Sequence, residues 1–176
     1  MTTSFSLRTL SRDDILHHLP ALSEILASCV NGGASVSFML PFAPQTAITF
    51  WQRTADSVAA GERIVLAAFD AEERPVGTVQ LITSQPENQP HRADVAKLLV
   101  HQNVRRQGIA LALMSELERI ARRERKTVLV LDTATGSGAE QFYVRCGWEK
   151  VGEIPRYALM PDGKMTATSL FYKFLP

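Results

Sequence analysis

The run from Val100 to Met114, V-H-Q-N-V-R-R-Q-G-I-A-L-A-L-M, constrains this chain more than any other segment. It joins an apolar, strand-like segment to an amphipathic helix through an Arg-Arg-Gln-Gly turn. The first turn of a helix leaves backbone N–H groups unpaired and carries the positive end of the helix dipole, so it attracts phosphate. Gly108 lets a ligand approach the backbone closely, and Arg105 and Arg106 add positive charge. The run therefore predicts a diphosphate-binding turn between a strand and a helix.

The patterns on both sides of this turn predict an α/β fold. The segment A-D-V-A-K-L-L-V at 93–100 is typical of a strand, and T-V-L-V-L-D at 127–132 predicts a second one. Between them, apolar residues recur at helical spacing, at Ile109, Leu113, Leu117 and Ile120. A-E-Q-F-Y-V-R-C-G-W at 139–148 predicts a short helix that Gly147 stops, with two strands after it.

The first half of the chain predicts a strand, two helices and a hairpin. Residues 5–10 alternate like a strand, and Ser11 is the expected N-cap of a helix that runs to about Val30. The loop N-G-G-A-S-V-S-F-M-L-P-F-A-P follows at 31–44, and its last proline is the expected start of a helix ending at Gly61. The apolar runs R-I-V-L-A-A-F and V-G-T-V-Q-L-I-T around D-A-E-E-R-P predict a β-hairpin.

Composition limits the class of protein. A chain of 176 residues, 45% of them hydrophobic, is expected to form a single domain over residues 1–176. A net charge of +1, from 19 basic and 18 acidic residues, gives no basis for a nucleic-acid partner. No stretch approaches the roughly 18 apolar residues of a membrane span and no signal pattern begins the chain, so we expect no membrane partner and a cytoplasmic location. The cysteines and histidines lack metal-ligand spacing, so no metal is expected.

Several residues in and after the basic turn match a known motif. The motif is R/Q-x-x-G-x-G/A after a strand, followed by a helix with a Tyr near G-W or G-F. Its residues here are Arg105, Gly108, Ala110, Tyr143, Gly147 and Trp148. The chain thus resembles the GNAT superfamily of acetyl-CoA-dependent N-acetyltransferases. The resemblance implies acetyl-CoA as cofactor and the GNAT acyl-CoA N-acyltransferase fold, a splayed mixed sheet of about seven strands with about four helices. It also allows a homodimer.

The resemblance assigns cofactor contacts to the strand end, the turn and the later helix. The pantetheine arm would pair with the strand edge at 98–100, and a backbone N–H near Leu99 would polarise the thioester carbonyl. Tyr143 would lie near the coenzyme sulfur and protonate the leaving thiolate, although it and Phe142 also suit a structural role as core aromatics. The expected cofactor-binding residues are Leu98, Leu99, Val100, Arg105, Arg106, Gln107, Gly108, Ile109, Ala110 and Tyr143.

Acetyl transfer also requires an acceptor for the proton of the attacking amine, because an amine with a pKa near ~10 is mostly protonated at neutral pH. Asp94 and Asp132 are the candidate carboxylates, since they lie on neighbouring strands where α/β proteins bind ligands. Asp94 interrupts an otherwise apolar strand, where a carboxylate is costly unless it is paired or functional. Lys97 is either its structural partner or faces solvent. Asp132 has a turn-capping role beside Thr133 as its alternative.

Loop sequences indicate a substrate class. Segments 31–39, 131–133 and 152–163 resemble the tabtoxin-resistance subgroup of GNAT enzymes, which acetylates a small β-lactam amino acid. The loop at 31–44 either covers the substrate or is a buried connector. The expected substrate-binding residues are Gly33, Ser35, Phe38 and Asp132.

We therefore expect an N-acetyltransferase that transfers acetyl directly, in a ternary complex, to the amine of a small amino-acid-like molecule. A peptide or protein amine acetyltransferase and a non-catalytic acyl-CoA sensor are the alternatives.

Overall fold

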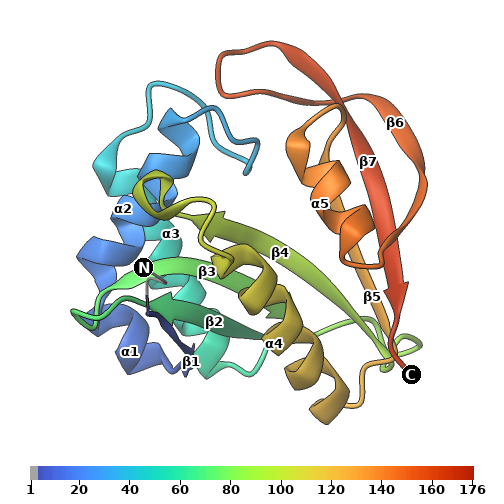
Figure 1. Ribbon diagram of the computed structural model, residues 1–176, viewed down its shortest axis with the longest axis horizontal. Helices are drawn as coiled ribbons and strands as arrows, with labels where there is room; N and C mark the ends of the chain where they lie inside the picture. Colours follow the sequence, from blue (N-terminus) through green and yellow to red (C-terminus); the bar gives the residue numbers. More distant parts are fainter. Residues whose placement is uncertain (1–3) are drawn as a thin grey trace.

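A seven-stranded mixed sheet with helices on both faces organises the computed structural model, which describes residues 4–176 (Figure 1). The strands are β1 (Ser6–Leu10), β2 (Arg63–Phe69), β3 (Pro75–Ile82), β4 (Arg92–Val100), β5 (Val128–Ala134), β6 (Glu149–Leu159) and β7 (Met165–Phe174). The helices are α1 (Arg12–His17), α2 (Leu19–Asn31), α3 (Pro44–Ala59), α4 (Ile109–Arg123) and α5 (Gly138–Arg145), with a 3-10 turn η1 (Gln102–Val104).

The spatial order of the strands is β1-β2-β3-β4-β5-β7-β6. All neighbouring strands are antiparallel except β4 and β5, which are parallel. The expected mixed sheet is therefore confirmed, and so is the hairpin, which is β2 and β3.

The helix expected from residue 11 to about Val30 is instead two helices, so the described chain has five α-helices where about four were expected. Pro20 has no N–H to donate to the carbonyl four residues earlier, which favours a break before it. His18 accordingly leaves helical geometry at φ −99° and ψ 19°, and α2 begins at Leu19.

Two of the expected helix boundaries have clear physical causes. Ser11 is the N-cap of α1, because its Oγ accepts from the Asp14 N–H at 3.1 Å while the Asp14 carboxylate accepts from the Ser11 N–H at 2.8 Å. Helix α3 begins at Pro44 as expected, but it ends at Ala59 and not at Gly61. Gly61, at φ +75°, lies in the turn that follows.

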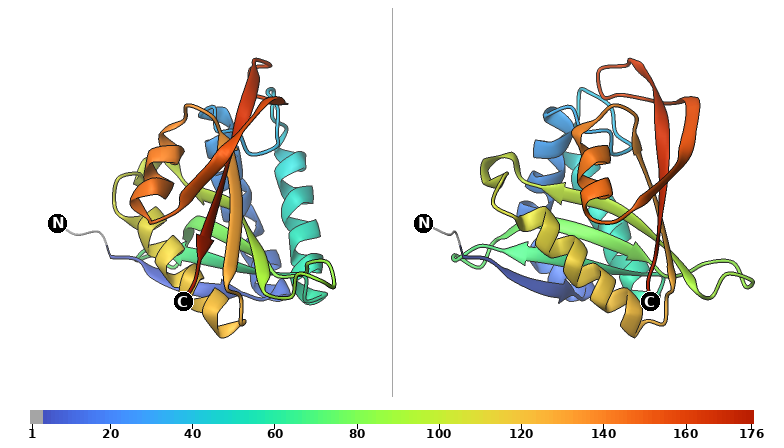
Figure 2. Two further views of the ribbon diagram at one scale, coloured as in Figure 1. Left: turned by 90° about the vertical axis from the view of Figure 1, so that its right-hand side faces the viewer. Right: turned by 45° about the vertical axis from the view of Figure 1, so that its right-hand side comes forward.

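Two apolar cores lie on opposite faces of the sheet. Helices α4 and α5 cover one face and helices α1, α2 and α3 cover the other (Figure 2). Helix α4 packs tightly, because a Cβ atom at Gly77 of β3 would lie 3.0 Å from Ile109 Cγ2. This packing fixes the N-terminus of α4 beside the end of β4. No helix of the described chain is long and apolar enough to cross a membrane.

Candidate active site

Strands β4 and β5 pair over only three residues each, Arg92–Asp94 with Val128–Val130. Beyond that point the two strands diverge, and we call the region between their separated ends the wedge (Figure 1). The opposite edge of β4 stays paired, with Leu99 facing Thr78 of β3. The β5-facing edge of Leu98–Val100 therefore has no strand partner in the described chain. The Val100 carbonyl accepts from the Arg105 and Cys29 side chains. The other backbone groups on this edge need a hydrogen-bonding ligand or water, which fits the expected pantetheine contact.

The basic turn opens directly onto the N-terminus of α4. Gly108 is the N-cap at φ +80°, and no side chain caps the first N–H groups of the helix. A Cβ atom at this glycine would have no neighbour within 4 Å, so open space lies in front of the helix end. Arg106 and Gln107 are exposed beside it. The turn therefore offers free N–H donors and positive charge to a diphosphate.

Arg105 is exposed but contacts the end of β4 and helix α2. Its Nε donates to the Val100 carbonyl at 3.3 Å, and its Nη2 lies 3.8 Å from the Cys29 sulfur. Burial raises the pKa of the Cys29 thiol, so this sulfur stays protonated. The neighbouring η1 turn is tied to α2, because Gln102 Nε2 donates to the Ser28 carbonyl at 2.9 Å. Arg105 therefore shapes the turn that presents the helix N-terminus.

Tyr143 projects from α5 into the core beneath the wedge. Its ring is 8% exposed and packs against Trp148 and Phe171. Burial raises the pKa of its hydroxyl to about 12, and the charges of Cys146 and Asp132 add to the effect. The side chain is thus a core aromatic whose phenol keeps its proton, and its role at the coenzyme sulfur stays a prediction.

Asp132 lies on the β5 side of the wedge and is exposed. Its Oδ2 accepts from Thr168 Oγ1 on β7 at 2.8 Å. This contact is with a side chain across the sheet and not with a backbone N–H of the adjoining turn. The charge of Asp132 raises the pKa of Tyr143 and opposes the lowering of the Lys97 pKa.

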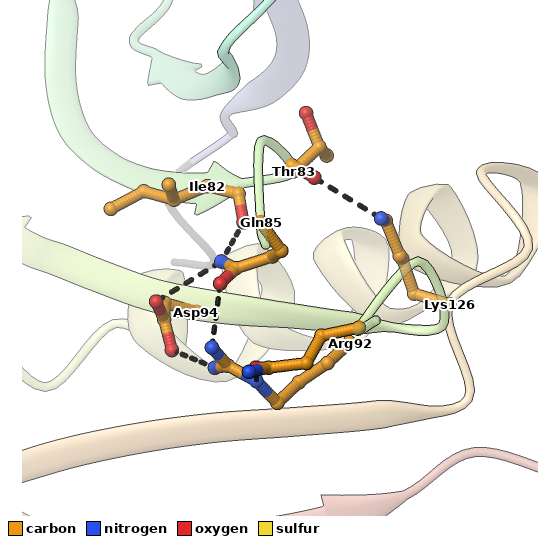
Figure 3. Close-up of polar contacts among 7 residues, drawn as sticks. Ile82, Thr83, Gln85, Arg92, Asp94 and Lys126 are labelled. Carbon is orange, nitrogen blue, oxygen red and sulfur yellow. Dashed lines mark hydrogen bonds and ion pairs between the residues drawn. The ribbon is translucent and has the colours of Figure 1, made fainter. Parts of the chain in front are cut away.

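Asp94 lies at the closed end of β4, where β4 still pairs with β5. Its carboxylate accepts from Arg92 Nη1 at 2.5 Å and from Gln85 Nε2 at 3.1 Å (Figure 3). Gln85 also donates to the Ile82 carbonyl at 3.0 Å. The figure shows these side chains meeting where the connector between β3 and β4 rejoins the sheet. The structure therefore groups Asp94 with this connector and not with Asp132 and Tyr143.

From the sequence, Lys97 was given no role in the site. The β3–β4 register shifts between Thr78 and Gln80, which places Lys97 in a bulge at φ +54°. Its Nζ lies 3.3 Å from Ser37 Oγ in the loop at 31–44. It neither pairs with Asp94 nor simply faces solvent. A lysine inside an apolar strand was the available signal, but its direction depended on a bulge that the sequence does not mark.

The loop at 31–44 is hydrogen-bonded to the hairpin of β6 and β7. Its Leu40 N–H donates to the Pro161 carbonyl, in the turn between β6 and β7, at 2.9 Å. Phe38 packs against Phe42 and Phe50 with ring centroids 5.2 and 5.6 Å apart. Phe38 also lines a pocket of about 450 Å³ along α3.

The other two substrate candidates lie earlier in this loop. Gly33 is exposed at φ +91°, and Ser35 is half-buried. The aromatic side chains of the loop thus pack as in a connector, and its role as a substrate cover stays a prediction.

Comparisons with known proteins agree with this geometry. The acetyltransferase (GNAT) family model matches residues 26–148. An N-acetyltransferase from Staphylococcus aureus is 14% identical at a TM-score of 0.79, with 99% of this chain and 100% of that one covered. A ribosomal-protein-alanine N-acetyltransferase from Brucella melitensis is 22% identical at a TM-score of 0.76, with 97% and 99% covered. The Salmonella typhimurium protein yncA, solved with its cofactor acetyl-CoA, is 15% identical at a TM-score of 0.78, with 99% and 95% covered.

The solved structures establish the fold, and the family model establishes membership, because its match takes in the C-terminal part of α2, the basic turn, the open end of β4 and the helix of Tyr143. The chain belongs to the GNAT family of acetyltransferases, whose cofactor is acetyl-CoA.

Proposed function

We propose that this enzyme transfers acetyl from acetyl-CoA directly to the amine of a small amino-acid-like molecule, of the kind used by the tabtoxin-resistance subgroup. The choice of a small acceptor rests on the contact between the loop at 31–44 and the turn that joins β6 to β7. The loop at 31–44 is hydrogen-bonded to the β6–β7 turn through Leu40 and Pro161 at 2.9 Å. A cover of this kind suits a small molecule better than an extended peptide, which needs an open groove. A cytoplasmic location and a homodimer are further parts of the proposal.

The catalytic roles follow from what each side chain can do with a proton. Acetyl-CoA, when bound, supplies the acetyl group as a thioester. Asp132 is exposed at the wedge, so its carboxylate accepts the proton of the acceptor amine, directly or through water. Burial raises the pKa of Tyr143 to about 12, so its phenol is protonated at neutral pH. We assign it the donation of a proton to the leaving sulfur, and the tyrosinate then regains a proton from water. Backbone N–H groups at the open edge of Leu98–Val100 polarise the carbonyl.

Asp94 is the second candidate for the proton acceptor. Its carboxylate is half-buried and already accepts from Arg92 and Gln85. Arg92 and Gln85 thus engage both oxygens of Asp94, whereas the contact of the exposed Asp132 with Thr168 involves its Oδ2. This difference supports Asp132 as the first choice.

Free-thiol release from acetyl-CoA, measured across amino acids, polyamines, aminoglycosides, peptides and tabtoxinine-β-lactam, tests the proposal. We expect turnover on amino-acid-like amines and initial rates that fit a ternary complex. Turnover on peptides alone would favour a protein amine acetyltransferase. Acetyl-CoA binding without turnover on any acceptor would favour an acyl-CoA sensor. Ping-pong kinetics, or an acetylated protein that accumulates without acceptor, would contradict direct transfer.

A further inference from the structure

The bulge in β4 aims Lys97 away from the regular pattern of its strand. Two β4 residues, Lys97 and Leu98, lie opposite the single β3 residue Val79, because the register shifts at this point. The φ of +54° is a left-handed conformation that an L residue adopts only at a cost of about 1–2 kcal/mol. Bulges commonly redirect a side chain beside an active site. Here the redirected side chain is that of Lys97, which contacts Ser37 in the loop at 31–44.

The ammonium group of Lys97 lacks an anionic partner. Its Nζ contacts Ser37 Oγ at 3.3 Å, and it forms no ion pair with any carboxylate of residues 4–176. Lys97 is half-buried, and this burial lowers the pKa of its ammonium group, while the charge of Asp132 opposes the shift. Withdrawing an ammonium from water without pairing it is costly. The position therefore favours a negatively charged ligand group.

Two arginines, Arg63 and Arg53, add positive charge on the side of the sheet that Lys97 faces. Arg63 acts on Lys97 through its charge, and it borders the pocket of about 450 Å³ that Phe38 also lines. Arg53 lies in the same pocket wall, and no carboxylate lines that pocket. Arg63 is held in place by donating to Gln80 Oε1 and Ser57 Oγ, both at 2.8 Å. A polycationic acceptor would meet repulsion here, whereas an acceptor with a carboxylate would not.

We propose that Lys97 and Ser37 bind the carboxylate of an amino-acid acceptor while its amine lies at Asp132. Lys97 would then determine specificity, because it selects zwitterionic amines over amines without an anionic group. This inference rests on the proposed function and deepens it, since it names the second group that the acceptor must carry. A charge-assisted hydrogen bond between Lys97 Nζ and the carboxylate would supply the selection.

The test compares each free amino acid with its own amide, which keeps the amine but removes the negative charge. The wild-type enzyme should favour the acid over the amide by about tenfold or more in kcat/KM. Lys97→Met keeps the length of the side chain, and it should abolish most of this preference by lowering the rate on the acid alone. Lys97→Arg should restore part of the preference. Differences in amine basicity cancel, because the same substrate pair is compared between variants.

Lys164→Met is the matched control, since it removes an equal charge from a side chain that is 84% exposed. It should leave the acid preference unchanged. Acetyl-CoA affinity and thermal unfolding, measured for every variant, separate a loss of specificity from a loss of fold. An unchanged acid preference in Lys97→Met, or a wild-type preference for amides or polyamines, would overturn the assignment of Lys97.

A binding measurement separates this inference from the proposed reaction. Calorimetry with the common α-amino acids on the protein loaded with coenzyme A should show binding to the wild type and at least about tenfold weaker binding to Lys97→Met. If the acids bind in this way but no thiol is released with acetyl-CoA, the proposed reaction fails and the carboxylate site stands. If none of the acids binds, the carboxylate site is overturned whatever amine the enzyme acetylates.

Discussion

The two ends of β4 differ in how their polar groups are satisfied. At the first end, Arg92–Asp94 pairs with β5, and the Asp94 carboxylate accepts from Arg92 and Gln85. At the other end, within residues 4–176, Leu98–Val100 has no strand partner on the β5 side, and the ammonium of Lys97 contacts the Ser37 hydroxyl and no carboxylate. The same strand therefore changes from a closed structural segment to an open one within a few residues.

The difference shows which backbone and charged groups of this fold are available to bind a ligand. Buried backbone and charged groups are nearly always paired in folded proteins. Groups that stay unpaired at the open end of β4, and at the uncapped N-terminus of α4, are therefore the ones that a ligand can satisfy. A carboxylate at the closed end has the same chemistry as one at the open end but fewer free lone pairs. The predictions below test this contrast, beginning with the largest expected effect.

Gly108→Asp should have the largest effect, because it places a carboxylate and a strained φ of +80° at the open helix N-terminus. Repulsion of the diphosphate at close range should weaken acetyl-CoA binding by about 1000-fold or more, measured by calorimetry. Gly61→Asp is the matched control, because Gly61 has a φ of +75° and equally open space around its Cβ position. The control should lose stability alone. Equal acetyl-CoA affinity in both variants would remove the diphosphate from this turn.

Exchanging each carboxylate for an amide tests the two ends of the contrast directly. Asp132→Asn should lower kcat/KM by about 100-fold, because the proton acceptor is lost while the shape of the side chain is kept. Asp94→Asn should leave kcat/KM within about threefold and lower the free energy of unfolding by about 1–2 kcal/mol, since it weakens the contact with Arg92. Steady-state kinetics and denaturant unfolding measure the two effects. The opposite pattern would make Asp94 the base.

Sequence reasoning anticipated the parts of this molecule that depend on local pattern. The strand-turn-helix unit around Gly108 and the capping box at Ser11 follow from residue type and spacing, and the structure has both. The break before Pro20 was missed because the apolar pattern continues across it, although the proline itself was a visible signal.

In the candidate site, too, local pattern was predicted from the sequence and tertiary contacts were not. The sequence pointed to Asp94 and Asp132 as carboxylates on neighbouring strands, and the family resemblance pointed to Tyr143. Lys97 was left unassigned. Which carboxylate is occupied by neighbours depends on Gln85 and Arg92 meeting across a connector. Such tertiary contacts, like the bulge at Lys97, are not encoded in spacing along a single strand.

Tyr143→Phe tests whether the phenol of Tyr143 donates a proton to the leaving sulfur. Losing the phenol proton should lower kcat on the order of tenfold, with water replacing part of its role, and it should leave acetyl-CoA affinity unchanged. Tyr157→Phe is the control, because that ring is 54% exposed on β6. Wild-type turnover in Tyr143→Phe would leave the residue a purely structural aromatic.

The raised pKa of Tyr143 also predicts a pH dependence of stability. Because burial raises the pKa to about 12, the unfolded chain releases this proton near pH ~10 while the folded chain retains it. Folding stability should therefore fall as pH rises from about 10 towards 12, since the folded state then binds more protons than the unfolded state. The Tyr143→Phe variant should lack this part of the decline. Identical alkaline unfolding profiles of the two proteins would mean that the hydroxyl is not held in its protonated form.

Thr168→Val should have the smallest effect, because it removes only the hydroxyl that orients Asp132. The Thr168 Oγ1 donates to Asp132 Oδ2 at 2.8 Å, and Val keeps the branched shape of the side chain. Loss of one hydrogen bond of about 1 kcal/mol corresponds to a decrease of about fivefold in kcat. Thr166→Val, on the same strand, is the control, since its hydroxyl contacts the Ala167 carbonyl and not the carboxylate. If Asp132 is the proton acceptor, combining Thr168→Val with Asp132→Asn should give no further loss, whereas additive losses would place the effect of Thr168 elsewhere.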